Sequence, residues 1–561
     1  MCGICGVVRA GRSPNENLAL VADLNARQRH RGPDSADTCS AGDVAIGQAR
    51  LALVDLTNAG RQPFVSPDGT IAVVFNGEIY NHQELRGRHR LGASGRCDGA
   101  ILPELWSRLG VEMFRELRGM YATAVVDRRR HTLTLARDPF RVKPLRWTTA
   151  ADGAIVFASE IRPLLAFRTT PRIRATALRR YLRFGAVGRL ESVSAHLLSD
   201  VPVALLLSWG LDSAAIAWAC REIDHRLTCV TVDQGGSMGE GDGARRVARR
   251  FGHRHEIVTS RPDEESVARY FAAMQRPTID GLNTFVVSDA IARRGIKVAV
   301  SGLGGDEVLG GYPVFRALRR LPLLQVTDRL FLARLLARTV RWRHEKVAEL
   351  LGPDGPRDAA GLGALSQQIL DRDTVDSLAP WASAPAPGPR RGRTDTSALA
   401  LSHYEIEHYL GATLLPDTDA FSMASSIELR VPYVDVPFAR LVLAADRKQG
   451  LGKVGFARCL GDSELVAIAR RRKQGFTLPM DGWMRHGPLA PLVRSTESPT
   501  ATVRQILAPG AVDELLHGWR VGRLPWARAW LIVSLEHWLR SVGLDTVRLD
   551  EASGGLTLES A

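Results

Sequence analysis

The pattern that most constrains the fold is a β-strand, a tight loop and a helix at residues 201–223. The apolar run VPVALLL (201–207) is typical of a buried strand, and a helical pattern begins within SWGLDSA (208–214). A loop between a strand end and a helix N-terminus directs backbone N–H groups at a phosphate, and the close approach favours glycine. Trp209 stands where a small residue is expected, so the sequence leaves open whether the loop binds a nucleotide.

Strand and helix patterns continue to alternate beyond this loop, which indicates a doubly wound parallel α/β sheet. The predicted strands are 203–207, 227–232 and 297–300, and the predicted helices are 212–223 and 243–251. Further on, residues 316–350 and 398–540 are predicted to be mainly helical, with a Pro-, Gly- and Arg-rich loop at 384–395. The polar tail after about residue 546 is predicted to be frayed.

The first 165 residues have a different pattern, in which short strands alternate with turn residues and a few helices. This pattern predicts a layered α+β sandwich. The clearest strands are 44–47, 71–75 and 132–136, and the clearest helices are 15–30 and 99–109.

Composition narrows the function classes. A chain of 561 residues is too long for one core. The net charge of +14 comes from scattered basic residues, only six of which are lysine, so no nucleic-acid partner is predicted. Seven widely spaced cysteines do not suggest a disulfide framework. No apolar run is long enough for a membrane span, and the start lacks a signal-peptide pattern, so we expect a cytoplasmic protein without a membrane partner.

Cys2 is a candidate nucleophile. If the initiator methionine is removed, Cys2 carries both a thiol and a free α-amine, whose pKa near ~8 suits a general base. A cysteine at position 2 is weak evidence alone. Five further motifs follow it in order: HRGPDS (30–35), ARLALVDL (49–56), GRQPF (60–64), NGEIYNH (76–82) and ARDPFRVKPL (136–145).

In their order and spacing these motifs resemble the class II glutamine amidotransferases, and most closely the glutamine-dependent asparagine synthetases. The resemblance implies a sandwich of the N-terminal nucleophile type, in which Cys2 attacks the glutamine side-chain amide. It further implies an oxyanion hole from Asn76 and Gly77, and an Arg50 clamp on the α-carboxylate. The other glutamine-binding residues that it implies are Glu78 and Asp98, for the α-ammonium group, and Leu51, Leu53 and Val54.

Each of these residues also has a structural interpretation. Arg50 could form a surface ion pair, Asn76-Gly77 a type I′ turn, and Asp98 a helix N-cap. The chain also departs from the family at Arg141 and Arg146, and at Cys97 and Gly99-Ala100 around Asp98. We expect these departures to affect positioning rather than the reaction.

In the second half, an acidic pair follows the strand pattern at 297–300, within SGLGGDEVLGGY (301–312). Asp306 of this pair and Asp212 of the first loop both lie just after predicted strands. Parallel strand ends meet at a switch point where ligands bind, so the two carboxylates are predicted to share a Mg²⁺ ion that bridges nucleotide phosphates. Asp212 could equally cap its helix, and the two roles are compatible.

The stretches QRPTIDGLNT (275–284), DTDAFSMASSIELRVPYVD (417–435) and RRRKQGFTLPMDGW (470–483) complete the resemblance. It covers residues 1–185 and 198–490 and implies an ATP-pyrophosphatase domain over 196–540, after an amidotransferase domain over 1–185 and before a tail at 541–561. The implied ATP-binding residues are Leu206, Ser208, Gly210, Asp212, Ser213, Val232, Ser301 and Gly302. Lys473 would stabilise charge on the α-phosphate, although a solvated basic run is the alternative.

The resemblance implies that ATP activates a carboxylate as an acyl-adenylate, which ammonia from glutamine then converts to an amide. Aspartate is the default acceptor, a specialised carboxylate is the rival, and a homodimer is compatible with the family. Two departures from the family lie on the side of the acceptor site. One is Leu303, and the other is the connection between residues 188 and 197, which is several dozen residues shorter than in the family. The alternative class is a glutaminase with a degenerate synthetase half that acts as a scaffold or ammonia donor.

Trp209 and Ala214 are the departures that bear on this choice. Trp209 could have a negative φ with its indole directed away from the phosphates, a strained positive φ, or an indole that fills the phosphate pocket. The retained charged residues favour the first arrangement. We expect weakened but real ATP binding, which Trp209→Gly should improve by up to ~2 kcal/mol, the size of the strain.

Overall fold

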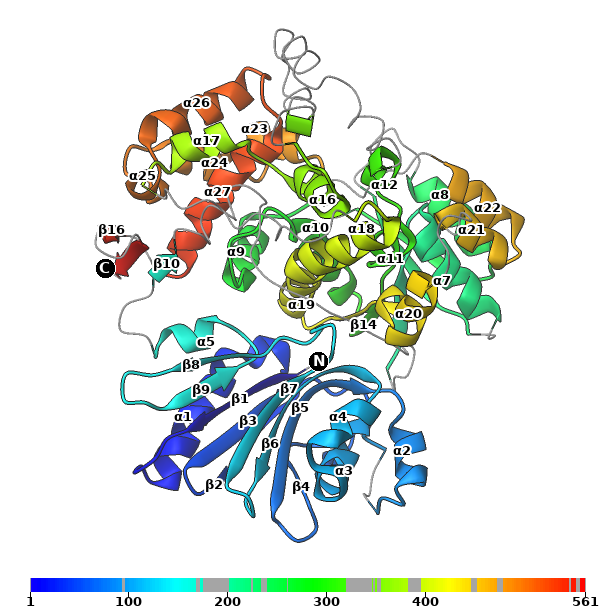
Figure 1. Cartoon of the computed structure of the whole chain (residues 1–561), viewed down its shortest axis with the longest axis vertical. Coiled ribbons are helices and arrows are strands. Elements are labelled where there is room, and N and C mark those ends of the chain that lie inside the picture. Colours follow the sequence, from blue (N-terminus) through cyan, green and yellow to red (C-terminus); the bar gives the residue numbers. More distant parts are fainter. Residues whose placement is uncertain are drawn as a thin grey trace.

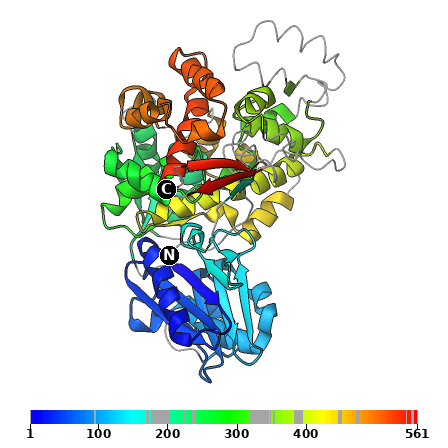
Figure 2. The ribbon, with the colours of Figure 1, turned by 90° about the vertical axis from the view of Figure 1, so that its left-hand side faces the viewer.

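The chain forms an N-terminal lobe, blue to cyan in Figure 1, and a larger C-terminal lobe above it. Figure 2 shows the same two lobes from the side. The computed structural model describes residues 2–92, 96–167, 172–174, 201–222, 225–233, 240–259, 261–318, 346, 349–350, 355–381, 395–444, 452–471, 478–543, 546–550 and 555–559.

Two antiparallel sheets build the N-terminal lobe. The first has the order β2 (Ser35–Ala41), β3 (Val44–Arg50), β1 (Gly3–Val8), β9 (Ile155–Ala158), β8 (Arg146–Thr149). The second has the order β4 (Phe64–Val65), β5 (Ile71–Ile79), β6 (Gly119–Asp127), β7 (Thr132–Arg137). The predicted α+β sandwich agrees with this arrangement, and the three strands predicted for this lobe lie within β3, β5 and β7.

Alternation of apolar side chains holds these layers together. Ile4 and Phe157 of the first sheet pack against Val74 and Ala124 of the second in one buried cluster. On the outer faces, α1 (Pro14–Arg27) covers the first sheet through Val21, and α3 (Leu102–Leu109) covers the second. The result is a helix–sheet–sheet–helix sandwich.

The C-terminal lobe contains a parallel sheet with the order β13 (Arg254–Val258), β12 (Thr228–Val232), β11 (Val203–Leu206), β14 (Val298–Val300), β15 (Glu428–Arg430). Leu205 packs with α7 (Leu211–Glu222) and α8 (Glu240–Arg250) on one face. Ala204 packs with α10 (Leu282–Ala292) on the other. Helices on both faces match the predicted doubly wound sheet, whose strand order reverses between β11 and β14.

Helices make up most of the rest of this lobe, as predicted for residues 398–540. Around the sheet lie α9 (Glu264–Ala273), α11 (Gly305–Leu309), α12 (Pro313–Leu318), α16 (Ala359–Gln367), α17 (Arg372–Leu378), α18 (Ala398–Glu405), the π-helix η5 (Ile406–Leu414), α19 (Leu415–Met423), α20 (Val436–Ala444), α21 (Gly452–Cys459) and α22 (Ser463–Arg470). A helical subdomain follows with α23 (Met480–His486), α24 (Ala490–Glu497), α25 (Val503–Ile506), α26 (Pro509–Arg520) and α27 (Trp526–Ser541).

The remaining elements are short. The N-terminal lobe adds α2 (His82–Arg88), α4 (Met113–Glu116) and α5 (Arg162–Leu165), with 3₁₀ turns at Arg29–Arg31, Asn58–Gly60, Asp98–Ile101 and Gly110–Glu112. One further 3₁₀ turn is Pro432–Val434. No helix in the described ranges is long and apolar enough to cross a membrane.

The prediction of a frayed C-terminal tail is wrong. Strands β16 (Thr546–Asp550) and β17 (Gly555–Glu559), red in Figure 2, form an antiparallel pair, and β17 also pairs with β10 (Arg172–Arg174). The tail therefore forms a hairpin whose inner strand, β17, lies between β16 and β10. Most of the helical region predicted at 316–350, and nearly all of the loop predicted at 384–395, lie outside the described residues.

Candidate functional site

Cys2 immediately precedes β1 and is buried. Its backbone N–H donates a hydrogen bond to Oδ1 of Asn76 on β5 at 3.0 Å. Burial raises the pKa of the Cys2 thiol above its usual value, although the N-terminal amine and Arg50 oppose the rise. The thiol is thus neutral in the free protein, so that a nucleophilic Cys2 needs a base close by.

Asn76 and Gly77 lie inside strand β5, opposite Ala122 and Tyr121 of β6. The alternative interpretation as a type I′ turn is therefore wrong. Gly77 has φ +145°, and a Cβ atom there would lie 1.9 Å from the carbonyl oxygen of Met120, so the position requires glycine. Within the described residues Nδ2 of Asn76 is buried without a hydrogen-bond partner, as expected for a donor that awaits an oxyanion.

A single pocket brings most of the predicted glutamine-binding residues together. It is lined by Cys2, Arg50, Leu51, Leu53, Val54, Gly77, Glu78 and Asp98, together with Gly60, Gln62, Phe75, Cys97, Glu428 and Arg430. The guanidinium group of Arg50 is buried and donates to the backbone carbonyl groups of Asp55 and Thr57. Arg50 is thus fixed by the loop after β3 and does not form the surface ion pair considered as its alternative.

Two carboxylates face this pocket. Asp98 accepts a hydrogen bond from the backbone N–H of Ile79 at 2.6 Å and is the first residue of a 3₁₀ turn, whose N-cap is Cys97. Burial raises the pKa of Asp98, and the bond from Ile79 opposes the rise. Burial also raises the pKa of Glu78 well above its usual range, and the opposing charge comes from Arg430 of the C-terminal lobe.

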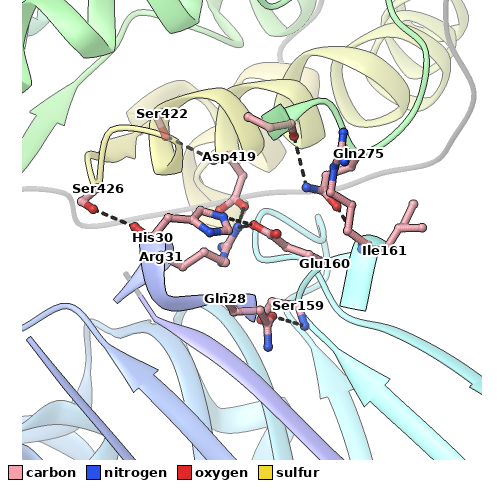
Figure 3. A network of polar contacts seen from close by, with 12 residues as sticks. Gln28, His30, Arg31, Ser159, Glu160, Ile161, Gln275, Asp419, Ser422 and Ser426 are labelled. Atoms are coloured by element: carbon pink, nitrogen blue, oxygen red, sulfur yellow. Dashed lines mark hydrogen bonds and ion pairs between the residues drawn. The ribbon is translucent and has the colours of Figure 1, made fainter. Parts of the chain in front are cut away.

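Buried polar contacts join the two lobes (Figure 3). Arg31 donates to the carbonyl oxygen of Cys2 at 3.3 Å, and its guanidinium group lies between Glu160 at 3.3 Å and Asp419 of α19 at 2.8 Å. His30 also contacts Glu160, at 2.8 Å. Arg31 therefore links the backbone of Cys2 directly to helix α19 of the C-terminal lobe.

The predicted nucleotide-binding residues lie at the carboxyl ends of three neighbouring strands. Leu206, Ser208, Gly210, Asp212 and Ser213 follow or end β11, Val232 ends β12, and Ser301 and Gly302 follow β14. The loop after β11 is closed by its own hydroxyl groups: the N–H of Ser208 donates to Oγ of Ser213, and that of Gly210 to Oγ of Ser208. A Cβ atom on Gly302 would lie 2.9 Å from the N–H of Ser213, so the two loops touch.

Asp212 and Asp306 meet at one ammonium group. Nζ of Lys453 on α21 lies 2.5 Å from an oxygen of each carboxylate. Burial lowers the pKa of Lys453, but the two carboxylates outweigh this effect and hold the pKa above its usual range. Paired carboxylate oxygens fit the donor set of Mg²⁺, which takes one or two carboxylates together with phosphate oxygens and water. The described part of the chain contains no group of three or more metal-ligating side chains.

The indole of Trp209 lies away from the loop interior. Trp209 does not have a positive φ, and its ring is packed so closely on α8 that a Cβ atom on Gly243 would lie 1.8 Å from it. The guanidinium carbon of Arg471 lies 3.1 Å from the ring centroid, and the backbone N–H of Trp209 donates to Oε1 of Glu240 at 2.7 Å. This is the unstrained arrangement. The premise for the predicted gain in affinity with Trp209→Gly, relief of strain, is therefore wrong.

Sequence reasoning missed several residues of these sites. Lys453, Glu428 and Arg430 reach the two sites from distant segments, and Arg471 reaches Trp209 in the same way. The only sequence signal for these residues was their charge and their position within a recognised motif or near one. Lys473 and the shortened connection at 188–197 lie outside the described residues.

Comparison with known proteins supplies the family. Residues 1–209 match the glutamine amidotransferase domain family, and residues 190–540 match the asparagine synthase family. Asparagine synthetase 1 of Bacillus subtilis, named as glutamine-hydrolysing, is 26% identical over 87% of this chain and 88% of its own length. Asparagine synthetase 2 of Arabidopsis thaliana is 30% identical over 56% of this chain and 61% of its own. Amidase chyE of Penicillium rubens is 27% identical over 51% and 54%.

Proposed function

The chain belongs to the asparagine synthase family, and from this premise we propose that it transfers ammonia from glutamine to a carboxylate that ATP has activated. It is an asparagine-synthase-like, glutamine-hydrolysing carbon–nitrogen ligase. The observation that carries the proposal is the pairing of Asp212 and Asp306 at Lys453, in a chain that also has a pocket around Cys2 lined by most of the predicted glutamine-binding residues. A degenerate synthetase half would not need that pairing.

In the N-terminal lobe, Sγ of Cys2 attacks the amide carbon of glutamine, with the α-amine of a processed Cys2 as the base. Nδ2 of Asn76 and the N–H of Gly77 stabilise the oxyanion, an effect of about 3 kcal/mol in comparable enzymes. Collapse of the intermediate releases ammonia and leaves a thioester, which water hydrolyses to glutamate. Arg50 holds the α-carboxylate, and Glu78 with Asp98 holds the α-ammonium group.

In the C-terminal lobe, the loops after β11, β12 and β14 bind ATP. The acceptor carboxylate attacks the α-phosphate, forms an acyl-adenylate and releases pyrophosphate; ammonia then displaces AMP. Mg²⁺, when bound, neutralises charge on the phosphates, and Asp212 with Asp306 would hold it. Lys473 is proposed as the cation for the α-phosphate.

The acceptor is proposed to carry an amino group, with aspartate as the default and a specialised amino-bearing carboxylate as the rival. Support comes from Asp280, which is hydrogen-bonded by Tyr409 and whose pKa burial raises to about 7. The ring of Tyr409 lies 6.1 Å from that of Tyr312, whose hydroxyl donates to Glu307 of α11, next to Asp306. The carboxyl groups of Asp280 and Glu307 are therefore buried acidic groups near the nucleotide loops, which suits the binding of an ammonium group.

Pyrophosphate exchange into ATP, measured with a panel of carboxylates, tests the proposal. Exchange with aspartate, or with another amino-bearing carboxylate, is the expected result. Glutamine hydrolysis without exchange for any acceptor would contradict it and favour the glutaminase with a degenerate synthetase half.

A further inference from the structure

The glutamine pocket is completed by a residue of the other lobe. Arg430 is fully buried at the end of strand β15, which is an edge strand of the parallel sheet, yet its side chain lines the pocket around Cys2. Glu428 of the same strand lines this pocket as well. The pocket therefore exists in its present form only while the two lobes are joined.

Two carboxylates share the guanidinium group of Arg430. One terminal nitrogen lies 2.6 Å from Oε2 of Glu78, and Nε donates to Oε1 of Glu428 at 2.7 Å. Both carboxylates are 2% exposed. Burial raises the pKa of Glu78 well above its usual range and the charge of Arg430 opposes this rise, whereas the binding of an ammonium group needs the ionised form. The planar guanidinium fork can hold both carboxylates at once, which a lysine ammonium group does less well.

The backbone of Arg430 belongs to the nucleotide site. Arg430 lies in register with Val300 of β14, and its carbonyl oxygen accepts a hydrogen bond from the N–H of Ser301 at 2.7 Å. Ser301 opens the second nucleotide loop. One residue thus has its side chain in the glutamine pocket and its carbonyl group on the ATP side.

We propose that Arg430 is a positioning residue that holds Glu78 for the α-ammonium group of glutamine and couples the occupancy of the glutamine pocket to ATP binding. The inference rests on the proposed function. It assigns to the synthetase lobe a part in glutamine recognition, and to the segment 428–430 the link between the two sites.

Glutaminase kinetics test the positioning role. Arg430→Gln should raise the KM for glutamine at least tenfold with a smaller change in kcat, and Arg430→Lys should restore part of the loss. The matched control is Lys297→Gln, which removes another ion pair between the lobes, to Asp34 at 3.0 Å, and whose side chain does not line the glutamine pocket. An unchanged KM in Arg430→Gln, or an equal KM increase in the control, would overturn the assignment.

A double-mutant cycle separates positioning from a loss of structure. In a Glu78→Gln background, Arg430→Lys should have little further effect on the KM, because Arg430 acts through Glu78. If the effect of Arg430→Lys is the same in both backgrounds, Arg430 does not act through Glu78 and the proposal fails. Arg430→Lys keeps the buried positive charge, so this arm does not depend on a neutral variant that folds poorly.

Calorimetry with ATP and Mg²⁺ tests the coupling. In Cys2→Ala, which cannot turn glutamine over, saturating glutamine should change the Kd for ATP at least fivefold, and Arg430→Lys should reduce this factor towards one. A factor of one in Cys2→Ala itself, or a factor that Arg430→Lys leaves unchanged, would refute the coupling. If the parent protein hydrolyses no glutamine, the proposed function fails first; if it does and the Arg430 variants behave like the parent, only this inference fails.

Discussion

Cys2 and Asn76 are in contact although 74 positions separate them, and both were predicted from the sequence. Such residues can be predicted because their chemistry requires a particular residue type within a short motif. Lys453 contacts Asp212 across 241 positions, and nothing in its own neighbourhood indicates that contact. The residues that the sequence failed to predict are of this kind: their role depends on which distant segment the fold brings to them.

The carboxylate of Asp306 gives the residue-scale prediction. Asp306→Asn should remove most Mg²⁺-dependent ATP binding and spare glutamine hydrolysis, because it deletes one of the two charges proposed for the metal. Calorimetry with ATP and Mg²⁺ measures the first effect and a glutaminase assay the second. Asp373→Asn, in the first turn of α17, is the control and should bind ATP like the parent. Equal affinity in Asp306→Asn and the parent would refute the shared-metal role.

At the scale of elements, periodic patterns predicted helices and strands with one buried face, and continuous apolar runs predicted the strands of the parallel sheet, which are covered on both faces. The parallel sheet followed from the alternation of β11, α7 and β12. The tail was mispredicted because β17, besides forming a hairpin with β16, pairs with β10, and this long-range contact leaves no local pattern. Helix α8 shows a subtler dependence, because Gly243 provides the space that the indole of Trp209 occupies.

Gly243→Ala is the prediction at this scale. In an open helix, Gly→Ala stabilises by up to ~1 kcal/mol, but here the added Cβ atom would displace the Trp209 ring, so we expect lower stability and a raised KM for ATP. Thermal unfolding and ATP titration check both effects. Gly482→Ala in α23, where a Cβ atom meets nothing within 4 Å, should be neutral or stabilising. Trp209→Ala should relieve the defect of Gly243→Ala; a defect that persists in the double variant would contradict the packing account.

At the scale of the whole molecule, buried ion pairs between the lobes hold the glutamine pocket against the synthetase sheet. Arg31 contacts both Glu160 and Asp419, and Arg430, the last residue of β15, contacts Glu78 of the N-terminal lobe. The sequence predicted two lobes from the change in pattern near residue 196. It could not predict how they dock, because docking depends on single residues whose partners lie in the other lobe.

The acid stability of this interface follows from Glu160. Burial raises the pKa of Glu160, but His30 and Arg31 outweigh it and lower the value to about 2, below the ~4.3 of an unfolded chain. A carboxyl group whose pKa is lower in the folded than in the unfolded chain stabilises the fold at pH values above the unfolded pKa. Glu160 should therefore contribute about 3 kcal/mol to the free energy of unfolding above pH ~5, and this contribution should vanish as the pH falls from ~4 to ~2.

Thermal unfolding of the parent and of Glu160→Gln between pH 2 and 7 measures this contribution. The difference in unfolding free energy should shrink as the pH falls through that window. The exposed Glu514→Gln serves as the control and should give a small difference that does not vary with pH. A difference between the parent and Glu160→Gln that stays constant down to pH 2 would contradict the account.

The central claim is that one chain joins a Cys2-dependent glutaminase to an ATP-dependent amide synthetase. Its most direct test is amide synthesis by Cys2→Ala, assayed with the parent's own acceptor and either glutamine or ammonium as the nitrogen source. The account predicts that Cys2→Ala neither hydrolyses glutamine nor makes amide from it, yet makes amide and AMP from ammonium at a rate close to that of the parent. Unchanged glutamine turnover in Cys2→Ala, or loss of the ammonium-driven reaction from the folded variant, would contradict it.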